Sequence, residues 1–217
     1  MGTSFSYRIP SISAVLAIVL SQSIATQAAT IHLPVDIQAS HISATVMEPL
    51  ARMRDQPQTT GTFQIITGEI DGDPNNLAAT GHVSLVIDAT TYNTGNDTRG
   101  RHVIHSALQT FNYSAISFES TRIEDVKVEA PGALGTATVV GKLTLHGVTR
   151  EMNVPVNLSM SPDGIFDATG EITFDYTDFG ISPPSLLFIP AGKEVTVEFQ
   201  IRAERPSNPT PTPSSSP

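Results

Sequence analysis

Apolar residues recur at every second position along much of this chain. Residues 83–87 (VSLVI) put their apolar side chains on one side of an extended backbone, and residues 139–145 (VVGKLTL) do the same with a glycine between them. Such alternation is typical of antiparallel strands that have one dry face and one wet face. A turn rich in Gly, Asn and Asp follows the first stretch, at 93–100.

The same period of two predicts further strands, separated by clusters of Gly, Pro, Asn and Asp. Residues 101–112 break this period: Val103, Ala107 and Phe111 fall four apart, which predicts one short helix. Strands are expected within residues 31–46, 63–70, 81–91, 115–121, 136–146, 151–160, 170–176 and 195–203.

Seven or eight strands joined by short turns indicate an all-β fold, either a barrel or a sandwich. We expect an up-and-down antiparallel barrel of about eight strands with one short helix. Full closure removes sheet edges, and the strands carry few of the Lys and Pro residues that guard an open edge. A barrel of about eight strands can enclose one small or slender ligand.

The inward positions of the expected strands form one apolar set. This set would either line a tunnel for a ligand or fill the barrel as ordinary core, and the pattern alone leaves both possibilities open. The candidate ligand-binding residues are Phe63, Val83, Leu85, Ile87, Ile116, Phe118, Leu143, Leu145, Phe174, Val197 and Phe199.

The two ends of the chain differ from the middle. Residues 1–28 combine one Arg, a short apolar run and a small-residue end suited to cleavage after Ala28, which predicts a signal peptide and export to the periplasm or the medium. Residues 206–217 (PSNPTPTPSSSP) predict a disordered tail. One domain is therefore expected, from residue 29 to residue 205.

Charge and composition narrow the function further. The formal net charge is −9, and the absence of a basic cluster disfavours nucleic acid and anionic membrane surfaces as partners. The chain has no cysteine, so disulfides and thiolate metal sites are excluded. The oligomeric state stays open, a dimer included.

Several short segments occur in an order that resembles the YceI-like family, over roughly residues 31–204. The most specific are 93–96 (NTGN) with Arg99 and His102, and 141–149 (GKLTLHGVT). The others are Gly61-Thr62-Phe63, Ile87-Asp88-Ala89, Ile116-Ser117-Phe118-Glu119-Ser120 and Asp178-Phe179-Gly180-Ile181.

The resemblance implies a lipocalin-like barrel, usually exported, that binds a polyisoprenoid chain in its interior. It implies no catalytic residues and no cofactor other than a bound lipid. One position departs from the family pattern: Gly100 stands where an acid commonly follows the arginine. A carboxylate that could pair with Arg99 or His102 is missing there, and Asp88 or Asp97 could take its place.

Arg99 and His102 are candidate contacts for a ligand head group at the barrel rim. The alternative is that they fasten the 93–100 turn and the following helix. His102 and His105 also form a His-x-x-His pair, but no third ligand stands nearby in the sequence, so no metal site is expected.

The loop 182–191 (SPPSLLFIPA) places Leu186, Leu187, Phe188 and Ile189 in a row. It is a candidate lid or contact surface, or a buried crossing of the barrel end. The alternative function is therefore an interaction module with a solid barrel that works through this loop. A hydrolase is not supported, because no nucleophile, base and orienting group can be assembled from the motifs.

Overall fold

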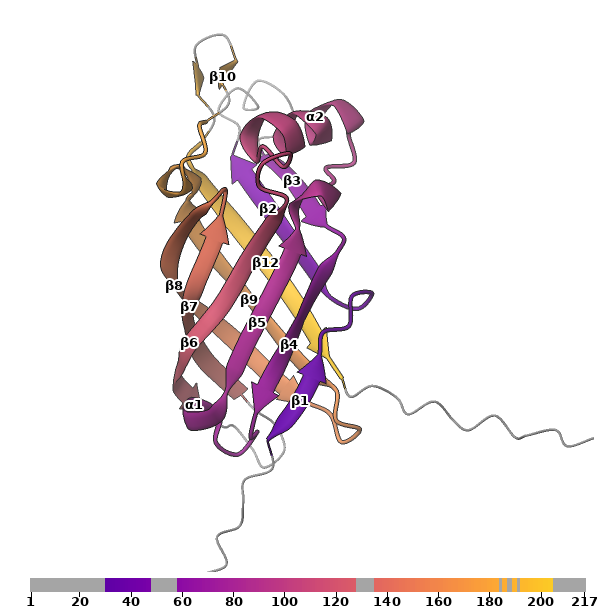
Figure 1. Cartoon of the computed structure of the whole chain (residues 1–217), viewed down its shortest axis with the longest axis vertical. Coiled ribbons are helices and arrows are strands. Elements are labelled where there is room, and N and C mark those ends of the chain that lie inside the picture. The colour runs from indigo at the N-terminus through magenta and orange to yellow at the C-terminus, as the bar shows by residue number, and fades with distance from the viewer. Residues whose placement is uncertain are drawn as a thin grey trace, which may run out of the picture.

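The computed structural model describes residues 30–47, 58–127, 135–183, 185–186, 189–190 and 192–204. The expected signal peptide (1–28) and tail (206–217) lie outside this part of the chain, as do Leu187 and Phe188. Strands dominate the described residues and wind around one long axis (Figure 1). Among these residues no helix is long and apolar enough to cross a bilayer.

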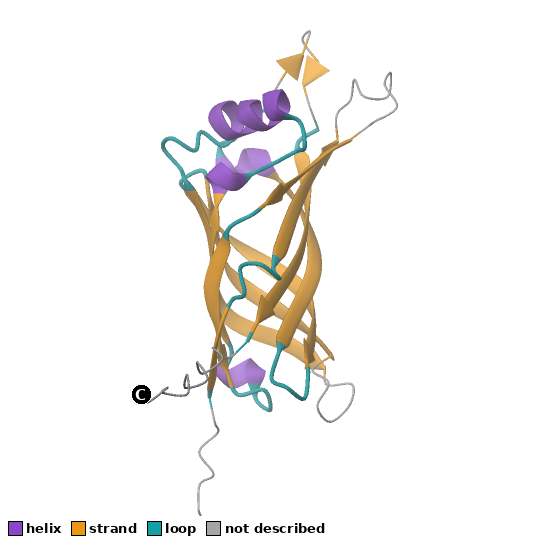
Figure 2. Ribbon diagram, turned by 90° about the vertical axis from the view of Figure 1, so that its right-hand side faces the viewer, coloured by secondary structure: helices purple, strands orange, loops and turns teal. Residues whose placement is uncertain are grey.

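The helical segments are short and lie at the two ends of the barrel (Figure 2). The strands are β1 (Ile31–Pro34), β2 (His41–Met47), β3 (Gln58–Phe63), β4 (Ile66–Gly72), β5 (His82–Asp88), β6 (Ala115–Lys127), β7 (Gly135–Leu145), β8 (Val148–Met160), β9 (Phe166–Asp175), β10 (Ser185–Leu186), β11 (Ile189–Pro190) and β12 (Glu194–Ala203). The helical turns are α1 (Leu77–Thr80), η2 (Ala89–Thr91), α2 (Asp97–His102), the π-helix η3 (Val103–Ala107) and η4 (Tyr176–Phe179).

Ten strands form one antiparallel sheet in the order β1-β4-β5-β6-β7-β8-β9-β12-β2-β3. The two ends of this sheet meet, because β1 and β2 are halves of one bent strand and β3 and β4 are halves of the next. β1 pairs with β4, β2 pairs with β3, and bridges Val35–Ala203 and Thr62–Asn93 tie the bends to neighbouring segments. The sheet thus has ten strands rather than the eight or so that the pattern predicted, and the difference arises because two expected strands are each divided by a bend.

The bend between β1 and β2 corrects one expectation. The sequence pattern treats 31–46 as a single alternating strand, but Asp36 accepts hydrogen bonds from the backbone N–H groups of Gln38 and Ala39 and turns the chain. Ile37 is consequently 44% exposed rather than inward. In an Asx-type turn of this kind, the side chain binds backbone N–H groups that would otherwise be available to the strand, and the period of the apolar residues gives no sign of it.

The alternation otherwise holds along the barrel wall. In β8, Val154, Val156 and Leu158 are buried while Pro155 is exposed. The pairing of β8 with β9 spans only Asn157–Met160, so Pro155 lies beyond it and its missing N–H breaks no rung of that ladder.

The helix expected at 101–112 is partly wrong. Helicity begins earlier, at Asp97, because the Asn96 side chain accepts the Arg99 backbone N–H and caps α2. It then widens into the π-helix η3 and ends at Ala107. Phe111, expected to share a helix with Val103 and Ala107, lies beyond the end of the helix and is 98% exposed.

Candidate ligand-binding cavity

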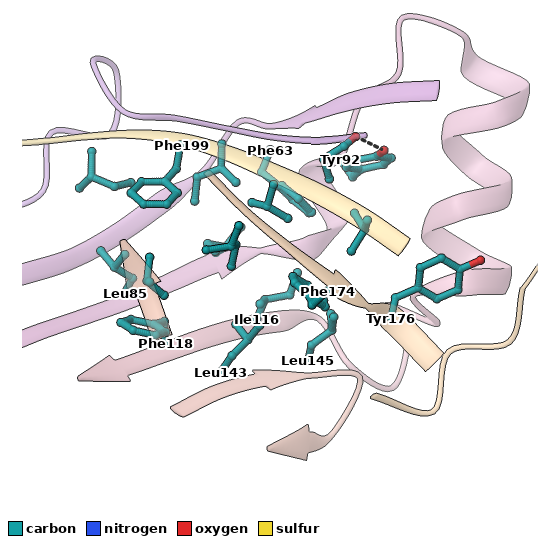
Figure 3. A pocket seen from close by; sticks show the side chains of 18 of the residues that line it. Phe63, Leu85, Tyr92, Ile116, Phe118, Leu143, Leu145, Phe174, Tyr176 and Phe199 are labelled. Carbon is teal, nitrogen blue, oxygen red and sulfur yellow. Dashed lines mark hydrogen bonds between the residues drawn. The ribbon is translucent and has the colours of Figure 1, made fainter. Parts of the chain in front are cut away.

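The barrel encloses a cavity of about 710 Å³. The eleven inward residues predicted from the alternation all line it, and in Figure 3 labelled side chains from several strands converge on one space. The lining is aliphatic and aromatic along most of its length, which is typical of a site for an apolar ligand. The barrel is therefore hollow rather than filled by its own side chains.

Three inward glycines widen this space by letting aromatic rings lie against the wall. A Cβ at Gly141 would come within 2.5 Å of the Phe118 ring, and one at Gly61 within 2.3 Å of the Tyr92 ring. Gly170 is likewise covered by Phe199. Because these rings occupy the space of the missing side chains, the centre of the barrel stays open.

One end of the cavity lies beside the short helix α1. Leu77 of α1 lines it together with Ile70 and Asp71 of β4. The other end is covered by residues 97–114, which we call the lid segment. It contributes Thr98, Arg99, His102, Val103, Ala107 and Leu108 to the lining.

Polar groups gather at the lid end. Tyr92 is 7% exposed, its ring packs at a tilt of 51° against Phe63 with centroids 5.0 Å apart, and its hydroxyl donates to the Ala44 carbonyl at 3.4 Å. Burial raises the pKa of Tyr92 to about 12, an effect that the nearby positive charge of Arg99 opposes. The Tyr176 hydroxyl donates to the Gly192 carbonyl at 2.7 Å, and burial raises the pKa of this residue too.

Arg99 and His102, the two predicted rim residues, both line the cavity at this end, Arg99 half-buried and His102 exposed. Arg99 is positioned by the α2 cap at Asn96. The Asp88 carboxylate, considered as a partner for them, accepts from the backbone and hydroxyl of Thr90 and caps η2. Both expected functions of Arg99, head-group contact and turn fastening, are compatible with this position.

The family-like segments meet in space and hold the loop after β9. His146 and Gly147 both have positive φ, +52° and +76°, which gives the tight two-residue turn between β7 and β8. The His146 ring packs on Tyr113, 4.4 Å between centroids, and its Nδ1 lies 3.3 Å from the Phe179 carbonyl. Arg150 donates two hydrogen bonds to the Asp178 carbonyl at 3.1 and 3.2 Å.

The loop 182–191, the candidate lid or contact surface, carries a two-strand hairpin: Leu186 belongs to β10 and Ile189 to β11. The tip residues Leu187 and Phe188 lie outside the described residues, so this expectation stays a prediction. Among the residues that the structure describes, the lid segment 97–114 covers this end of the cavity.

A polar cluster that the sequence analysis missed lies on β1 and β4. His32 Nδ1 is 2.6 Å from Asp71 Oδ1 and its Nε2 is 3.7 Å from Glu69 Oε2. The hydrogen bond and charge of Asp71 raise the pKa of His32, and Glu69 adds to this. The register that places His32 opposite Asp71 brings the three together, and it is not visible before the strands are paired.

Sequence reasoning also missed lining residues of β2, which are Ile42, Ala44 and Val46, and lining residues of the helical turns at the lid end. Tyr92, Val103 and Leu108 follow no period of two, because they come from helical turns. The period of two does place further lining residues on the apolar faces of their strands, although they were not among the eleven candidates: Val139, Val154, Val156, Leu158, Ile172, Val195 and Ile201.

Together the fold and the cavity define a lipocalin-like antiparallel β-barrel with an apolar interior. The chain belongs to the YceI-like domain family, whose model matches residues 34–203. A UPF0312 protein of Vibrio campbellii is 32% identical over 95 residues, 43% of this chain and 47% of that protein. The chain thus aligns with about half the length of such curated relatives.

Solved structures share the fold at low identity. BcnA of Burkholderia cenocepacia gives a TM-score of 0.65 at 21% identity, over 78% of this chain and 99% of that one. A polyisoprenoid binding domain from Saccharophagus degradans gives 0.61 at 18%, over 81% and 98%. The YceI protein of Campylobacter jejuni gives 0.56 at 18%, over 68% and 85%. At such identities these matches establish the fold alone.

Proposed function

We propose that this protein binds a polyisoprenoid or similar long apolar molecule inside its barrel and sequesters or carries it. One observation carries the proposal: the inward faces of the barrel strands enclose a continuous apolar cavity of about 710 Å³. The description of the Saccharophagus degradans structure as a polyisoprenoid binding domain supports the same ligand class. Binding, rather than catalysis, is the activity that the lining favours.

The cavity volume indicates a ligand size. An apolar cavity of about 150 Å³ holds one benzene, six carbon atoms. A volume of about 710 Å³ therefore accommodates roughly 28 carbons, or between five and six isoprene units, on the same scale. A longer chain would have to protrude from the barrel or widen it.

The affinity can be high although the contacts are unspecific. Each buried CH₂ contributes about 0.8 kcal/mol, so such a chain exceeds on paper the ceiling of about −20 kcal/mol for non-covalent binding. Ordering a flexible chain consumes much of this gain. We expect retention through purification, with selectivity set by the length and bore of the cavity.

We place the head group at the lid end, where the cavity has its larger group of polar residues. Arg99 is the charged side chain best placed to contact it, with His102 at the rim. The signal-like pattern of residues 1–28 supports export, where such a protein would meet lipids outside the cytoplasm.

Extraction of the protein from its native host with organic solvent, followed by mass spectrometry, tests this function. A prenyl chain of about 25 to 30 carbons is expected on the volume scale above. Repeated preparations without any bound lipid, from a protein that also fails to take up added prenyl alcohols, would reject the proposal.

A pair of variants makes the test specific to the cavity. Val197 lines the cavity beside Ala44 and Ile172 of the flanking strands, so Val197→Phe should block the bore and abolish uptake. Val86 is 42% exposed on the outer face of β5, so Val86→Phe is the matched control and should bind normally. Equal uptake by both variants would place the ligand outside the barrel.

A further inference from the structure

The most exposed large apolar side chain among the described residues belongs to the lid segment. Phe111 is 98% exposed, whereas the other exposed large hydrophobics, Val86, Ile65, Ile37 and Met47, range from 42% to 51%. Single surface hydrophobics are common and by themselves indicate nothing. The position of Phe111 and its surroundings are what distinguish it.

Phe111 is held outward by an ordered turn. Gln109 adopts φ of +48°, and its carbonyl accepts the N–H groups of Asn112 and Tyr113 at 2.8 and 3.1 Å. Thr110 is 5% exposed and its N–H donates to the Ile104 carbonyl at 3.0 Å. A non-glycine residue at positive φ costs about 1 kcal/mol or more, so the chain maintains a strained turn that presents the ring to solvent.

The ring lies next to the cover of the cavity. Val103, Ala107 and Leu108 line the cavity from the same segment, three to eight residues before Phe111. These residues belong to or follow the π-helix η3, in which the Leu108 N–H reaches back to the Val103 carbonyl. π-Helical turns are rare and frequent at functional sites. A ligand that crosses this end of the barrel must pass the segment that carries Phe111.

The whole chain has no basic cluster, which disfavoured anionic membranes on composition alone, but the lid segment is locally positive: with its histidines counted as neutral it has two arginines and one acid. It carries Arg99, Arg101, His102 and His105 against a single acid, Asp97, while the whole chain has a net charge of −9. Arg101, His102 and His105 are exposed. Other acids lie at this end of the barrel, including Asp178 and Glu194, so the positive character belongs to the lid segment itself.

A segment that carries an exposed aromatic ring together with exposed arginine and histidine has the composition of one that lies at a lipid–water interface. Cations meet the anionic head groups, and the ring enters the acyl boundary. A soluble protein partner could bind such a patch too. The lipid surface is favoured because the patch lies on the cover of an apolar cavity whose proposed ligand resides in membranes.

We propose that the outer face of the lid segment docks on a bilayer containing anionic lipids, with Phe111 inserted, so that the covered end of the cavity meets the membrane. This inference rests on the proposed function, because carrying a lipid is the reason for the protein to dock on a membrane. The docking itself can be measured without any ligand.

Co-sedimentation of the delipidated full chain with vesicles tests the docking. The vesicles are phosphatidylcholine alone or phosphatidylcholine mixed with phosphatidylglycerol. Wild-type protein should bind the mixed vesicles more tightly, and added salt should weaken binding. Phe111→Ser should bind about ten-fold more weakly or worse, because burial of a Phe side chain is lost. Val86→Ser, the matched exposed apolar control, should bind like wild type.

Charge reversal separates the electrostatic part. Arg101→Glu should lose affinity for the mixed vesicles and keep its weak affinity for phosphatidylcholine alone. Lys142→Glu, on the exposed face of β7, is the matched control and should change neither. If the wild-type protein binds neither type of vesicle, the docking proposal is wrong, and a protein partner becomes the alternative for this surface. Equal binding by Phe111→Ser and Val86→Ser also overturns the docking proposal.

Ligand transfer distinguishes this proposal from the proposed function. Phe111→Ser should still hold a prenyl alcohol added in solvent, since Phe111 does not line the cavity, but should take it up more slowly from mixed vesicles. Phe111-dependent vesicle binding by a protein that never takes up prenyl lipid would sustain the docking and reject the carrier function. If Phe111→Ser takes up the ligand from mixed vesicles at the wild-type rate, the carrier function still stands and the docking surface is rejected.

Discussion

The barrel wall and the lid segment are built on different principles. In the wall, a period of two puts one apolar side chain after another into the cavity, and backbone pairing fixes their register. In the lid segment, the backbone is irregular: α2 runs directly into the π-helix η3, and Gln109 has positive φ. The wall gives the ligand volume and apolar surface, whereas the lid supplies polar contacts and a route to the exterior.

A second comparison is between apolar side chains that border the cavity and apolar side chains that are buried but do not line it. Ile66 is fully buried and is not among the residues that line the cavity, whereas Ile172 is half-buried and lines it. Atoms that border an empty space have lost partners on one side. Side chains of the same type should therefore contribute unequally to the stability of a hollow barrel.

The largest expected effect is a loss of stability on substitution of a buried residue in the barrel wall. Ile66→Ala should lower the free energy of unfolding by about 2–5 kcal/mol, the usual cost of truncating a well-packed core residue. Ile172→Ala, the matched substitution at the cavity, should cost roughly half as much or less, because little packed surface is lost. Urea unfolding of the delipidated proteins measures both. Equal losses would mean that the barrel is filled.

The second effect concerns the lid end of the cavity. Tyr92 has a folded-state pKa of about 12, against an ordinary value near 10. The unfolded chain releases this proton first as pH rises, so stability is unchanged below pH 10 and falls between about pH 10 and 12. The full loss is about 2–3 kcal/mol.

Tyr92→Phe should remove most of this alkaline loss, since Tyr176, whose pKa is also raised, remains. Urea unfolding at several pH values from 9 upward provides the comparison. An unchanged alkaline slope in Tyr92→Phe would show that the hydroxyl of Tyr92 is not the buried group that titrates.

A smaller effect on stability is expected from a substitution at Gly61, where the barrel wall meets the Tyr92 ring. A Cβ at Gly61 meets only atoms of the Tyr92 ring among its three nearest neighbours, at 2.3 to 2.7 Å. Gly61→Ala should therefore displace the ring and cost about 1–3 kcal/mol. In a Tyr92→Leu background the same change should cost less, and a double-mutant cycle by urea unfolding measures the difference.

Gly100→Ala is the matched control on the other side of this junction. Gly100 lies inside α2, and a Cβ there would have no atom nearer than 3.7 Å. The substitution should stabilise the protein by about 0.5–1 kcal/mol, because alanine restricts the unfolded chain and favours helix. Similar losses at Gly61 and Gly100 would show that backbone freedom, rather than the Tyr92 ring, decides the cost.

The wall was predictable and the lid largely was not. Alternation identified eleven cavity residues, because the side of a strand is fixed by position parity alone. It failed at Ile37, where an Asp36 side chain turns the chain. The helical spacing failed at Phe111, because the π-helix ends at Ala107 and a turn at Gln109 follows. Arg99 was found through motif resemblance, since no local pattern marks a residue whose place depends on how the lid folds over the barrel.

The sequence also did not reveal the register in which the strands pair. The cluster of side chains that this register brings together gives the smallest of the predicted effects. His32, Asp71 and Glu69 meet because β1 pairs with β4 with His32 opposite Asp71. The raised pKa of His32 means that its protonated form is favoured by folding. This stabilisation is fully present below the ordinary histidine pKa of about 6.5 and disappears as pH rises through the raised value.

His32→Gln should abolish this pH dependence and leave stability at alkaline pH nearly unchanged, since the neutral ring adds little. The change is small because the pair is exposed and solvent screens it. Thermal unfolding from pH 5 to 8 at low ionic strength measures it, with Gln38→Ala, on the β1–β2 turn, as a surface control. A loss in His32→Gln that grows toward high pH would contradict the assigned ion pair. Such a result would mean that the neutral ring packs against the barrel wall, so that even the base of the barrel is held by apolar contact rather than by charge.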